Sequence, residues 1–233
     1  MNGSKRSWNR YWTLGSLAVI FAAAAAAMAI GRFTIAPKEL AAVLIPGSFP
    51  DVQVSGQVRT VISNIRFPRV VLALLSGAGL AAAGAAFQGL FANPLATPDT
   101  LGAANGASFG AVLGILLGLP AFGIQTLAMI TGVAAVLMAW SVAQVRGTIP
   151  PLMVILAGLG VSSLFSALVS LVKYAADPQD VLPSITYWLM GSMASTTKST
   201  LVMGAPFIAG GSMLLFLLRW RLNILSLQED ETR

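Results

Sequence analysis

The stretch "LGAANGASFGAVLGILLG", residues 101–118, has a glycine at every fourth position counted from its second residue. Residues four apart lie on the same face of an α-helix, so these glycines would leave one helix face without side chains. Lipid offers no hydrophobic drive for helix association, and small residues let two membrane helices pack closely. The stretch therefore predicts a helix inside a tightly packed bundle of membrane helices. The predicted packing residues are Gly102, Gly106, Gly110, Gly114 and Gly118.

The composition of the whole chain indicates the same class. Hydrophobic residues make up 56% of the 233 residues and charged residues only 9%, whereas a soluble domain has about 25% charged residues. Cysteine and histidine are both absent from the sequence, which excludes disulfides and the thiolate and imidazole ligands that most metal sites use. We therefore expect no metal site and no cofactor.

The net charge of +6 admits two explanations. Nucleic-acid-binding proteins are often basic, but basic residues of membrane proteins also anchor loops at the lipid headgroups. The apolar composition favours the second explanation, so we expect the lipid bilayer as a partner and no nucleic acid.

Six apolar stretches have the length of about 20 residues that a membrane helix needs. The first follows Lys5, Arg6 and Arg10. A basic start is also typical of cleaved signal peptides, but the long apolar run favours a retained helix. The predicted fold is all-α, a polytopic bundle of about six membrane helices near residues 11–30, 68–90, 101–119, 122–143, 149–173 and 201–218.

Two segments between these helices are expected outside the bilayer core. Residues 31–67 are polar and contain three prolines, and "ITYWLMGSM" (185–193) is apolar but too short to span, which predicts a short helix at the interface. Lys and Arg divide equally between the two sides of this topology. The orientation therefore rests on the basic flank of the first helix, which favours a cytoplasmic N-terminus.

Two motifs suggest other functions and lack the context that those functions need. "GASFG" (106–110) matches the G-x-S-x-G pattern of serine hydrolases, but that pattern needs a preceding strand and a histidine base. "NPL" (93–95) is similar to the Asn-Pro-Ala motif of six-helix water channels, which need two copies, and Asn-Pro occurs once here. A six-helix channel remains a minor alternative.

Two groups of polar residues are candidates for functional sites. Arg66 and Arg69 lie at the mouth of the second helix, where they would attract an acidic protein surface. Snorkelling of both side chains to the headgroups is the simpler alternative. Ser162, Ser166 and Ser170 share one face of the fifth helix, which suits either a partner helix or a water-filled path.

Three separated stretches together resemble one family. They are "RFPRVVLALLSGAGLAAAGAAFQGLFANPLATPDTLGAANGASFGA" (66–111), "SITYWLMGSM" (184–193) and "LNILSLQEDETR" (222–233). Each is similar to a stretch of the permeases of bacterial binding-protein-dependent ABC importers for iron–siderophore complexes, haem and vitamin B12. The stretches occur in the same order as in that family, and the resemblance covers nearly all of residues 11–233.

The resemblance implies a multi-pass permease of the bacterial cytoplasmic (inner) membrane. It would import a metal chelate, an iron–siderophore in the first place and haem or cobalamin as alternatives, by ATP-driven alternating access. The implied partners are a second permease subunit, cytoplasmic ATPase subunits and an extracytoplasmic substrate-binding protein. The chain lacks the Walker A sequence, so it would not be an enzyme, and a separate subunit would hydrolyse the ATP.

The resemblance also implies roles for particular residues. The binding protein would dock on Arg66 and Arg69. The translocation path would be lined by Ser162, Ser166 and Ser170. Coupling to the ATPase would use Leu225, Ser226, Leu227 and Glu229.

The chain departs from the resembled family in length. Members have about ten membrane helices, of which the last four repeat the arrangement of helices two to five. This chain contains the first repeat alone, so we expect a single permease domain, residues 1–233, truncated at the C-terminus within a coupling helix that starts in residues 223–233. A non-transporting membrane remnant of such a permease is the alternative function.

Overall fold

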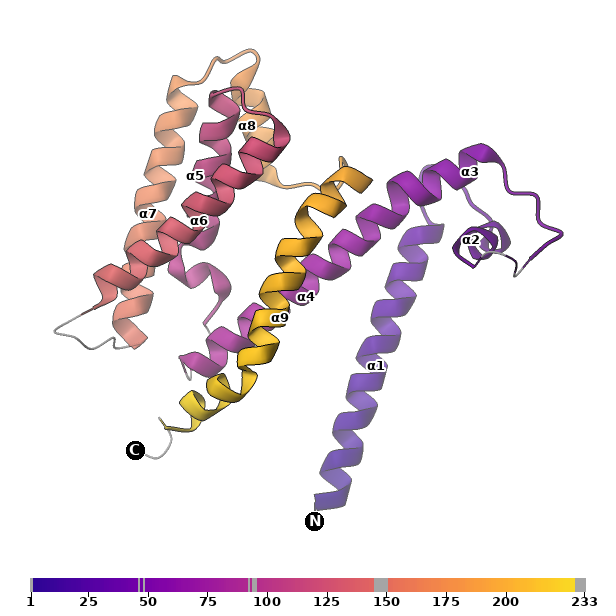
Figure 1. The fold of residues 1–233 in the computed structure, drawn as a ribbon, viewed down its shortest axis with the longest axis horizontal. Helices are drawn as coiled ribbons and strands as arrows, with labels where there is room; N and C mark the ends of the chain where they lie inside the picture. Colours follow the sequence, from indigo (N-terminus) through magenta and orange to yellow (C-terminus); the bar gives the residue numbers. More distant parts are fainter. Residues whose placement is uncertain are drawn as a thin grey trace. The chain divides into compact units, whose positions relative to one another are not determined.

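The computed structural model describes residues 2–45, 47, 49–91, 93, 96–144 and 151–228, and every regular element in these ranges is a helix (Figure 1). The all-α class is thereby confirmed. In chain order the elements are α1 (Asn2–Ala29), α2 (Pro37–Leu44), α3 (Gly56–Thr60), the π-helical η1 (Val61–Arg66), α4 (Phe67–Leu90), the 3₁₀-helical η2 (Pro98–Leu101), α5 (Ala103–Leu116), α6 (Ala121–Ala143), α7 (Pro151–Ala175), α8 (Val181–Met190) and α9 (Lys198–Gln228).

Five helical segments of the described chain are long and apolar enough to cross a membrane. The helix expected near residues 101–119 forms as α5, which has 14 residues and is shorter than the roughly 20 that a bilayer core requires. The other predicted membrane helices are present with shifted ends. The five candidate spans are Tyr11–Ala29, Gly56–Leu90, Ala121–Ala143, Leu152–Ala175 and Lys198–Ile224.

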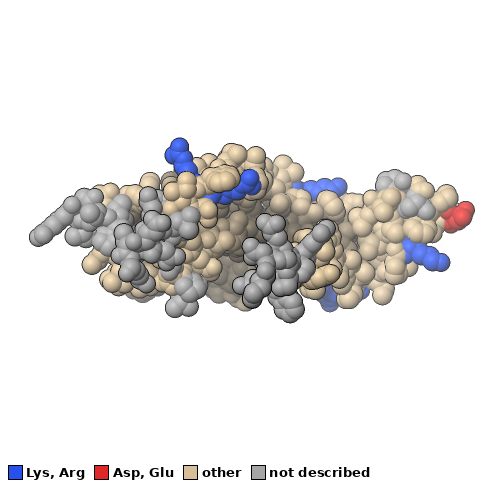
Figure 2. Space-filling model, turned by 90° about the horizontal axis from the view of Figure 1, so that it is seen from below, with Lys and Arg blue, Asp and Glu red and all other residues tan. Residues whose placement is uncertain are grey.

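The surface agrees with a membrane-spanning protein. Figure 2 shows a face on which uncharged residues cover most of the described surface, with few Lys and Arg and fewer Asp and Glu. Large apolar side chains are exposed along the candidate spans, for example Phe21 and Val19 on α1 and Leu217 on α9. Exposed apolar surface of this extent is typical of chains that bury it in lipid or against other helices.

The chain divides into two compact units. Unit 1 consists of Met1–Ser76 with Met193–Pro206, and unit 2 consists of Gly77–Ser192 with Phe207–Arg233. The two long helices α4 and α9 each contribute one end to each unit.

In unit 1, the second membrane helix begins at Gly56, well before the expected start at Pro68. The side chain of Ser55 accepts a hydrogen bond of 3.2 Å from the backbone N–H of Val58 and thereby caps the helix that begins at Gly56. A π-helical turn, η1, then precedes Pro68. Proline has no N–H to donate inside a helix, and membrane helices accommodate it with local π adjustments. The prediction read Pro68 as a helix start, whereas here it lies within a continuous helix.

The segment between α1 and α4 packs back onto α1, although it was expected as a polar connection. Met28 of α1 lies in a buried apolar cluster with Ile35, Leu40, Val58 and Ile62. Ile62, on η1, is 1% exposed. The short helices α2 and α3 thus form a small core at the C-terminal end of α1.

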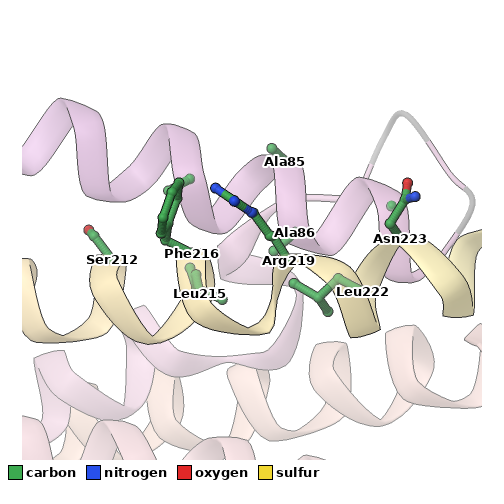
Figure 3. Close-up of a pocket in the computed structure, with 10 residues that line it drawn as sticks. Ala85, Ala86, Ser212, Leu215, Phe216, Arg219, Leu222 and Asn223 are labelled. Carbon is green, nitrogen blue, oxygen red and sulfur yellow. The ribbon is translucent and has the colours of Figure 1, made fainter.

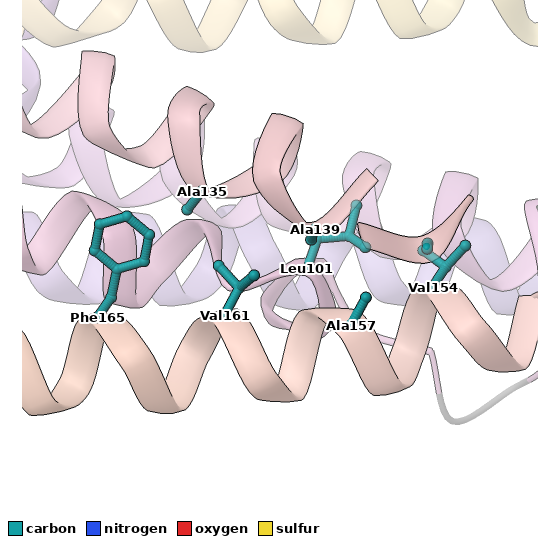
Figure 4. Packing of buried hydrophobic residues seen from close by; sticks show 8 residues of the cluster. Leu101, Ala135, Ala139, Val154, Ala157, Val161 and Phe165 are labelled. Carbon is teal, nitrogen blue, oxygen red and sulfur yellow. The ribbon is translucent and has the colours of Figure 1, made fainter. Parts of the chain in front are cut away.

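In unit 2, α5, α6 and α7 pack together and form the densest part of the described chain (Figure 1). Figure 4 shows Val154, Ala157, Val161 and Phe165 in line on one face of α7, directed toward Ala135 and Ala139 of α6. Alanines on α6 let the larger side chains of α7 approach the helix backbone, as is usual in membrane bundles.

The short helix expected at 185–193 is present as α8, residues 181–190. Its Ile185 is fully buried, in a cluster with Val112 of α5, with Val172 of α7 and with Ala176, which follows α7. The end of the chain also differs in detail from the expectation, because α9 runs without a break from Lys198 to Gln228. Within the described residues, the membrane helix expected to end near 218 and the first residues of the expected coupling helix thus belong to one helix, and a coupling role for this end stays a prediction.

Candidate functional site

Arg66, one of the two predicted docking residues, is buried in unit 1. Only 8% of its surface is exposed. One terminal nitrogen, Nη1, donates hydrogen bonds to the backbone carbonyls of Met28 at 2.6 Å and Ala29 at 2.8 Å. The other, Nη2, donates to the carbonyl of Phe33. The guanidinium therefore binds the end of α1 and the loop that follows it.

The chemistry of a helix C-terminus explains these contacts. The last carbonyls of a helix have no partner inside the helix, and the terminus carries a partial negative charge. A guanidinium offers several N–H donors in a fixed plane and can satisfy more than one of these carbonyls. Gly31 makes room for it, because a Cβ on Gly31 would lie 2.7 Å from Nη2 of Arg66.

Arg69, the second predicted docking residue, is half-buried in the same unit. Its Nη2 donates a hydrogen bond of 2.6 Å to the carbonyl of Ala194, 125 residues further along the chain. Its Nε is buried and has no hydrogen-bond partner among the described residues. Together with the bonds of Arg66, this contact places the end of α1, the start of α4 and the segment before α9 on one side of unit 1.

Three arginines line one cavity of about 580 Å³ in unit 1. They are Arg32, Arg66 and Arg69, and none of the described residues that line the cavity is acidic. The remaining walls are apolar and include Ile30, Phe33, Val61, Ile65, Val70 and Met193. The cavity thus combines positive charge with apolar walls and suits a ligand group that is anionic.

The serine face predicted on α7 is divided between two environments. Ser162 is half-buried against the turn before α5, since a Cβ on Gly102 would lie 3.0 Å from its Oγ. Ser166 and Ser170 are exposed, and Oγ of Ser170 donates a 3.1 Å hydrogen bond to the carbonyl of Ser166. Packing within unit 2 explains the position of Ser162, whereas the side chains of Ser166 and Ser170 remain accessible in this chain.

Three of the five glycines that are spaced four residues apart lie against α6. A Cβ on Gly106 would lie 2.5 Å from Cβ of Ala135, and one on Gly110 would meet Oγ1 of Thr131 and lie 2.5 Å from the carbonyl oxygen of Leu127. Gly114 is looser, with Ile124 Cα at 3.2 Å. No larger residue fits at Gly106 or Gly110 without moving α6.

The two outer glycines of the row have another role. Gly102 has φ +77° at the junction of η2 and α5, and Gly118 has φ +65° just after α5. A positive φ is the left-handed region, which glycine adopts at little cost. These two residues therefore begin and end α5.

Two further glycines outside the predicted row shape the structure, and the sequence alone indicated no partner for either. Gly31 faces the guanidinium of Arg66. Gly158 on α7 faces η2, where a Cβ would meet the carbonyl of Thr100. The run "AGLG" at 157–160 is the signal for Gly158, whereas no local pattern reveals Gly31, because its partner lies 35 positions away in the sequence.

The other motifs occupy ordinary structural positions. Ser108 of "GASFG" lies inside α5, in a helix and not in the strand-to-helix turn of a hydrolase. The last turn of α9 contains three of the predicted coupling residues, Leu225, Ser226 and Leu227, and the structure describes only their backbone. The fourth, Glu229, lies outside the described residues. Among the described residues there is no group of three or more His, Cys, Asp or Glu placed to hold a metal.

Comparison with known proteins identifies relatives over most of the chain. Residues 16–233 match the FecCD transport family. The molybdate import system permease protein MolB of Haemophilus influenzae is 36% identical over 207 residues, which cover 88% of this chain and 61% of MolB. The hemin transport system permease protein HmuU of Yersinia pestis is 33% identical over 181 residues, which cover 72% of this chain and 52% of HmuU.

A solved structure has the same fold. A metal-chelate-type ABC transporter in an inward-facing conformation aligns with a TM-score of 0.77 at 34% identity, over 94% of this chain and 65% of that one. The chain therefore spans between about half and two thirds of the length of these relatives. The match over residues 16–233 and the shared helical fold confirm the resemblance seen in the three sequence stretches, and this chain belongs to the FecCD transport family.

Proposed function

We propose that the chain acts as a permease that imports a metal chelate through the membrane, driven by a separate ATPase. The observation that carries this proposal is the agreement of the family match with the fold of a metal-chelate-type ABC transporter over 94% of the chain. The chain itself would supply the path and no ATP chemistry. The permease would work by alternating access between the two sides of the membrane.

An iron–siderophore complex is the proposed cargo. A probable iron chelatin transport system permease protein of Helicobacter pylori is 35% identical over 172 residues, and the H. influenzae relative is named for molybdate. Haem and cobalamin are the alternatives within the same chelate class. Because the organic chelator encloses the metal, a chain without histidine and cysteine is compatible with each of these chelates.

The proposed topology has a cytoplasmic N-terminus and an outer face made by the arginine cavity. Lys5, Arg6 and Arg10 precede the first span, and basic flanks stay in the cytoplasm. One crossing by α1 then brings Met28 and Phe33 to the outer side. The hydrogen bonds of Arg66 and Arg69 bring the start of α4 and the segment before α9 to that same side.

Docking of the binding protein is proposed at this outer cavity, on the predicted residues Arg66 and Arg69. Support comes from three guanidinium groups around one cavity and from the absence of acidic residues among the described residues that line it. Carboxylates of a partner would find uncompensated positive charge there. Arg69, half-buried and with an unpaired Nε among the described contacts, would contribute more directly than Arg66, whose terminal nitrogens already bind carbonyls.

The path is proposed to pass along the exposed part of the serine face of α7. Ser166 and Ser170 are exposed in this chain and would meet the second permease subunit or water. Ser162 would support the path from behind, because it packs against Gly102. Coupling to the ATPase is proposed at the end of α9, on Leu225, Ser226, Leu227 and Glu229.

The competing proposal is a membrane remnant that does not transport, and uptake decides between the two. The chain would be expressed in a strain that lacks its own chelate permeases, with and without the C-terminal part of a longer relative, alongside the matching ATPase and binding protein. We expect uptake of a labelled iron–siderophore only when both parts are present, because the chain spans 52–61% of its curated relatives. Failure of the combined parts would support the remnant, and uptake of molybdate alone would reject the chelate class.

A further inference from the structure

A groove of about 380 Å³ lies between α4 and α9 in unit 2 (Figure 3). The α4 wall is made of small residues: Ala82, Ala85, Ala86 and Gly89. The α9 wall includes Leu215 and Phe216. On the N-terminal side of the groove in both helices, a Cβ on Gly79 of α4 would lie 2.9 Å from Ile208 of α9. The two helices therefore approach closely near Gly79 and Ile208, and the mainly apolar groove opens between them beyond this contact.

One cation projects into this groove. The guanidinium of Arg219 lies over the ring of Phe216, with 4.0 Å between Cζ and the ring centroid. Figure 3 shows both side chains directed from α9 toward α4. Stacking on an aromatic ring orients a guanidinium while its N–H edge stays free to bind. None of the described residues that line the groove is acidic, so the positive charge is not neutralised by the groove itself.

The groove lies at the ends of two candidate membrane spans. These spans are Gly56–Leu90 and Lys198–Ile224, so Gly89 is one residue and Arg219 five residues from the respective ends. Five helical residues correspond to about 7.5 Å. The cation is thus close to headgroup depth, and the small-residue wall extends from there into the hydrocarbon region.

We propose that this groove binds one anionic phospholipid, with its phosphate on Arg219 and an acyl chain along the small-residue face of α4. A guanidinium matches the oxygens of a phosphate in a planar, bidentate arrangement. Basic pockets between membrane helices bind anionic headgroups in the cytoplasmic leaflet. The assignment to that leaflet rests on the proposed topology, but the binding itself does not depend on transport, on the ATPase or on the cargo.

The experiment measures lipid retention by the intact chain. The chain would be reconstituted in nanodiscs of mixed phosphatidylglycerol and phosphatidylcholine, released into mild detergent and analysed for bound lipid by native mass spectrometry. We expect phosphatidylglycerol to be retained in preference to phosphatidylcholine. Arg219→Gln should reduce this retention about fivefold, the effect of one basic residue near an anionic lipid surface.

Two further variants separate the site from general charge and from misfolding. Arg221→Gln removes the same charge two positions away, at a residue outside the described lining, and should leave retention unchanged. Gly89→Leu fills the groove without changing charge, and it should fold, because a Cβ on Gly89 meets nothing within 4 Å. It should reduce retention as Arg219→Gln does.

Each other outcome overturns the proposal. Equal losses in Arg221→Gln and Arg219→Gln would indicate unspecific attraction of acidic lipid. Full retention in Gly89→Leu would show that the groove is not occupied by lipid. Release of the bound species by inorganic phosphate would indicate a site for the free anion, and a change of oligomeric state in Gly89→Leu without any lipid loss would indicate a second copy of the chain in the groove.

Discussion

The guanidinium of Arg66 donates a 2.6 Å hydrogen bond to the backbone carbonyl of Met28, 38 residues earlier in the chain. This bond joins the π-helical turn of the second span to the last turn of the first. Arg66 therefore has a structural task in addition to any contact with a partner. The cavity beside it also contains Arg69 and Arg32, which carry no comparable set of three carbonyl bonds among the described contacts.

Replacing Arg66 by Gln should destabilise unit 1. The substitution leaves carbonyls of Met28, Ala29 and Phe33 without their donor, and a lost charge-assisted hydrogen bond costs about 1.5–3 kcal/mol. We expect a lower thermal midpoint in detergent, measured by the loss of monodisperse protein on heating. Arg59→Gln is the matched control in the same unit, because Arg59 is exposed. Equal thermal midpoints for the two variants would contradict a stabilising role for the hydrogen bonds of Arg66 to these carbonyls.

Replacing Gly110 by Leu should separate α5 from α6. A Cβ at this position already meets Thr131 and the carbonyl of Leu127, and overpacking of a well-filled interface costs about 1–3 kcal/mol. Gly84→Leu is the control in unit 2, since a Cβ on Gly84 meets nothing within 4 Å. Limited proteolysis in detergent measures the difference. Faster digestion of the Gly84 variant than of the Gly110 variant would count against the close packing.

Reversing the charge of Arg69 should weaken capture of the binding protein. Surface charges act mainly on the association rate, and electrostatic steering contributes about tenfold or more at low ionic strength. We expect Arg69→Glu to slow association in a complete permease and to make the rate less sensitive to salt, because screening then has less attraction to remove. Surface plasmon resonance at two salt concentrations measures both effects.

The control for that experiment is Arg219→Glu, the same charge change in unit 2. It should leave association almost unchanged. An unchanged association rate of Arg69→Glu at low salt would remove Arg69 from the docking site, whereas its stability would still report on the bond to Ala194.

Single cysteines on α7 should reveal whether water reaches the serine face. The chain has no native cysteine, so every labelled thiol is the introduced one. Ser166→Cys and Ser170→Cys should react with a charged, water-soluble thiol reagent in the assembled transporter. Ala157→Cys, at a position that is 8% exposed, should not react. Labelling of the two serine positions by apolar reagents alone would show that they face lipid or a partner helix.

Much of the fold followed from patterns that are local in the sequence. Apolar runs of membrane length and the fourfold glycine spacing depend on residues within one helix, and they predicted the all-α bundle and the helix at the centre of unit 2. The start of the second span was misplaced at Pro68 because a proline usually marks a helix start. A π-helical turn leaves no comparable mark in the sequence, so the continuous helix from Gly56 was not foreseen.

The candidate sites followed only in part. The serine spacing correctly placed three residues on one helix face, but Ser162 turned out to pack against Gly102, on another element. The end of α9 illustrates the same limit, since helix propensity cannot indicate whether the chain bends between residues 218 and 223 or continues as a single helix.

The sequence by itself determined the membrane class, the helical bundle and the family resemblance, because composition, hydrophobic length and short motifs are properties of contiguous residues. The tertiary structure alone decided which polar side chains are already bound within the chain. Arg66 and Arg69 stand three positions apart and look equivalent in the sequence. Arg66 meets the unpaired carbonyls at the end of α1, and Arg69 meets Ala194, 125 residues away. Such partners come together only when distant segments fold against each other, and no local pattern records them.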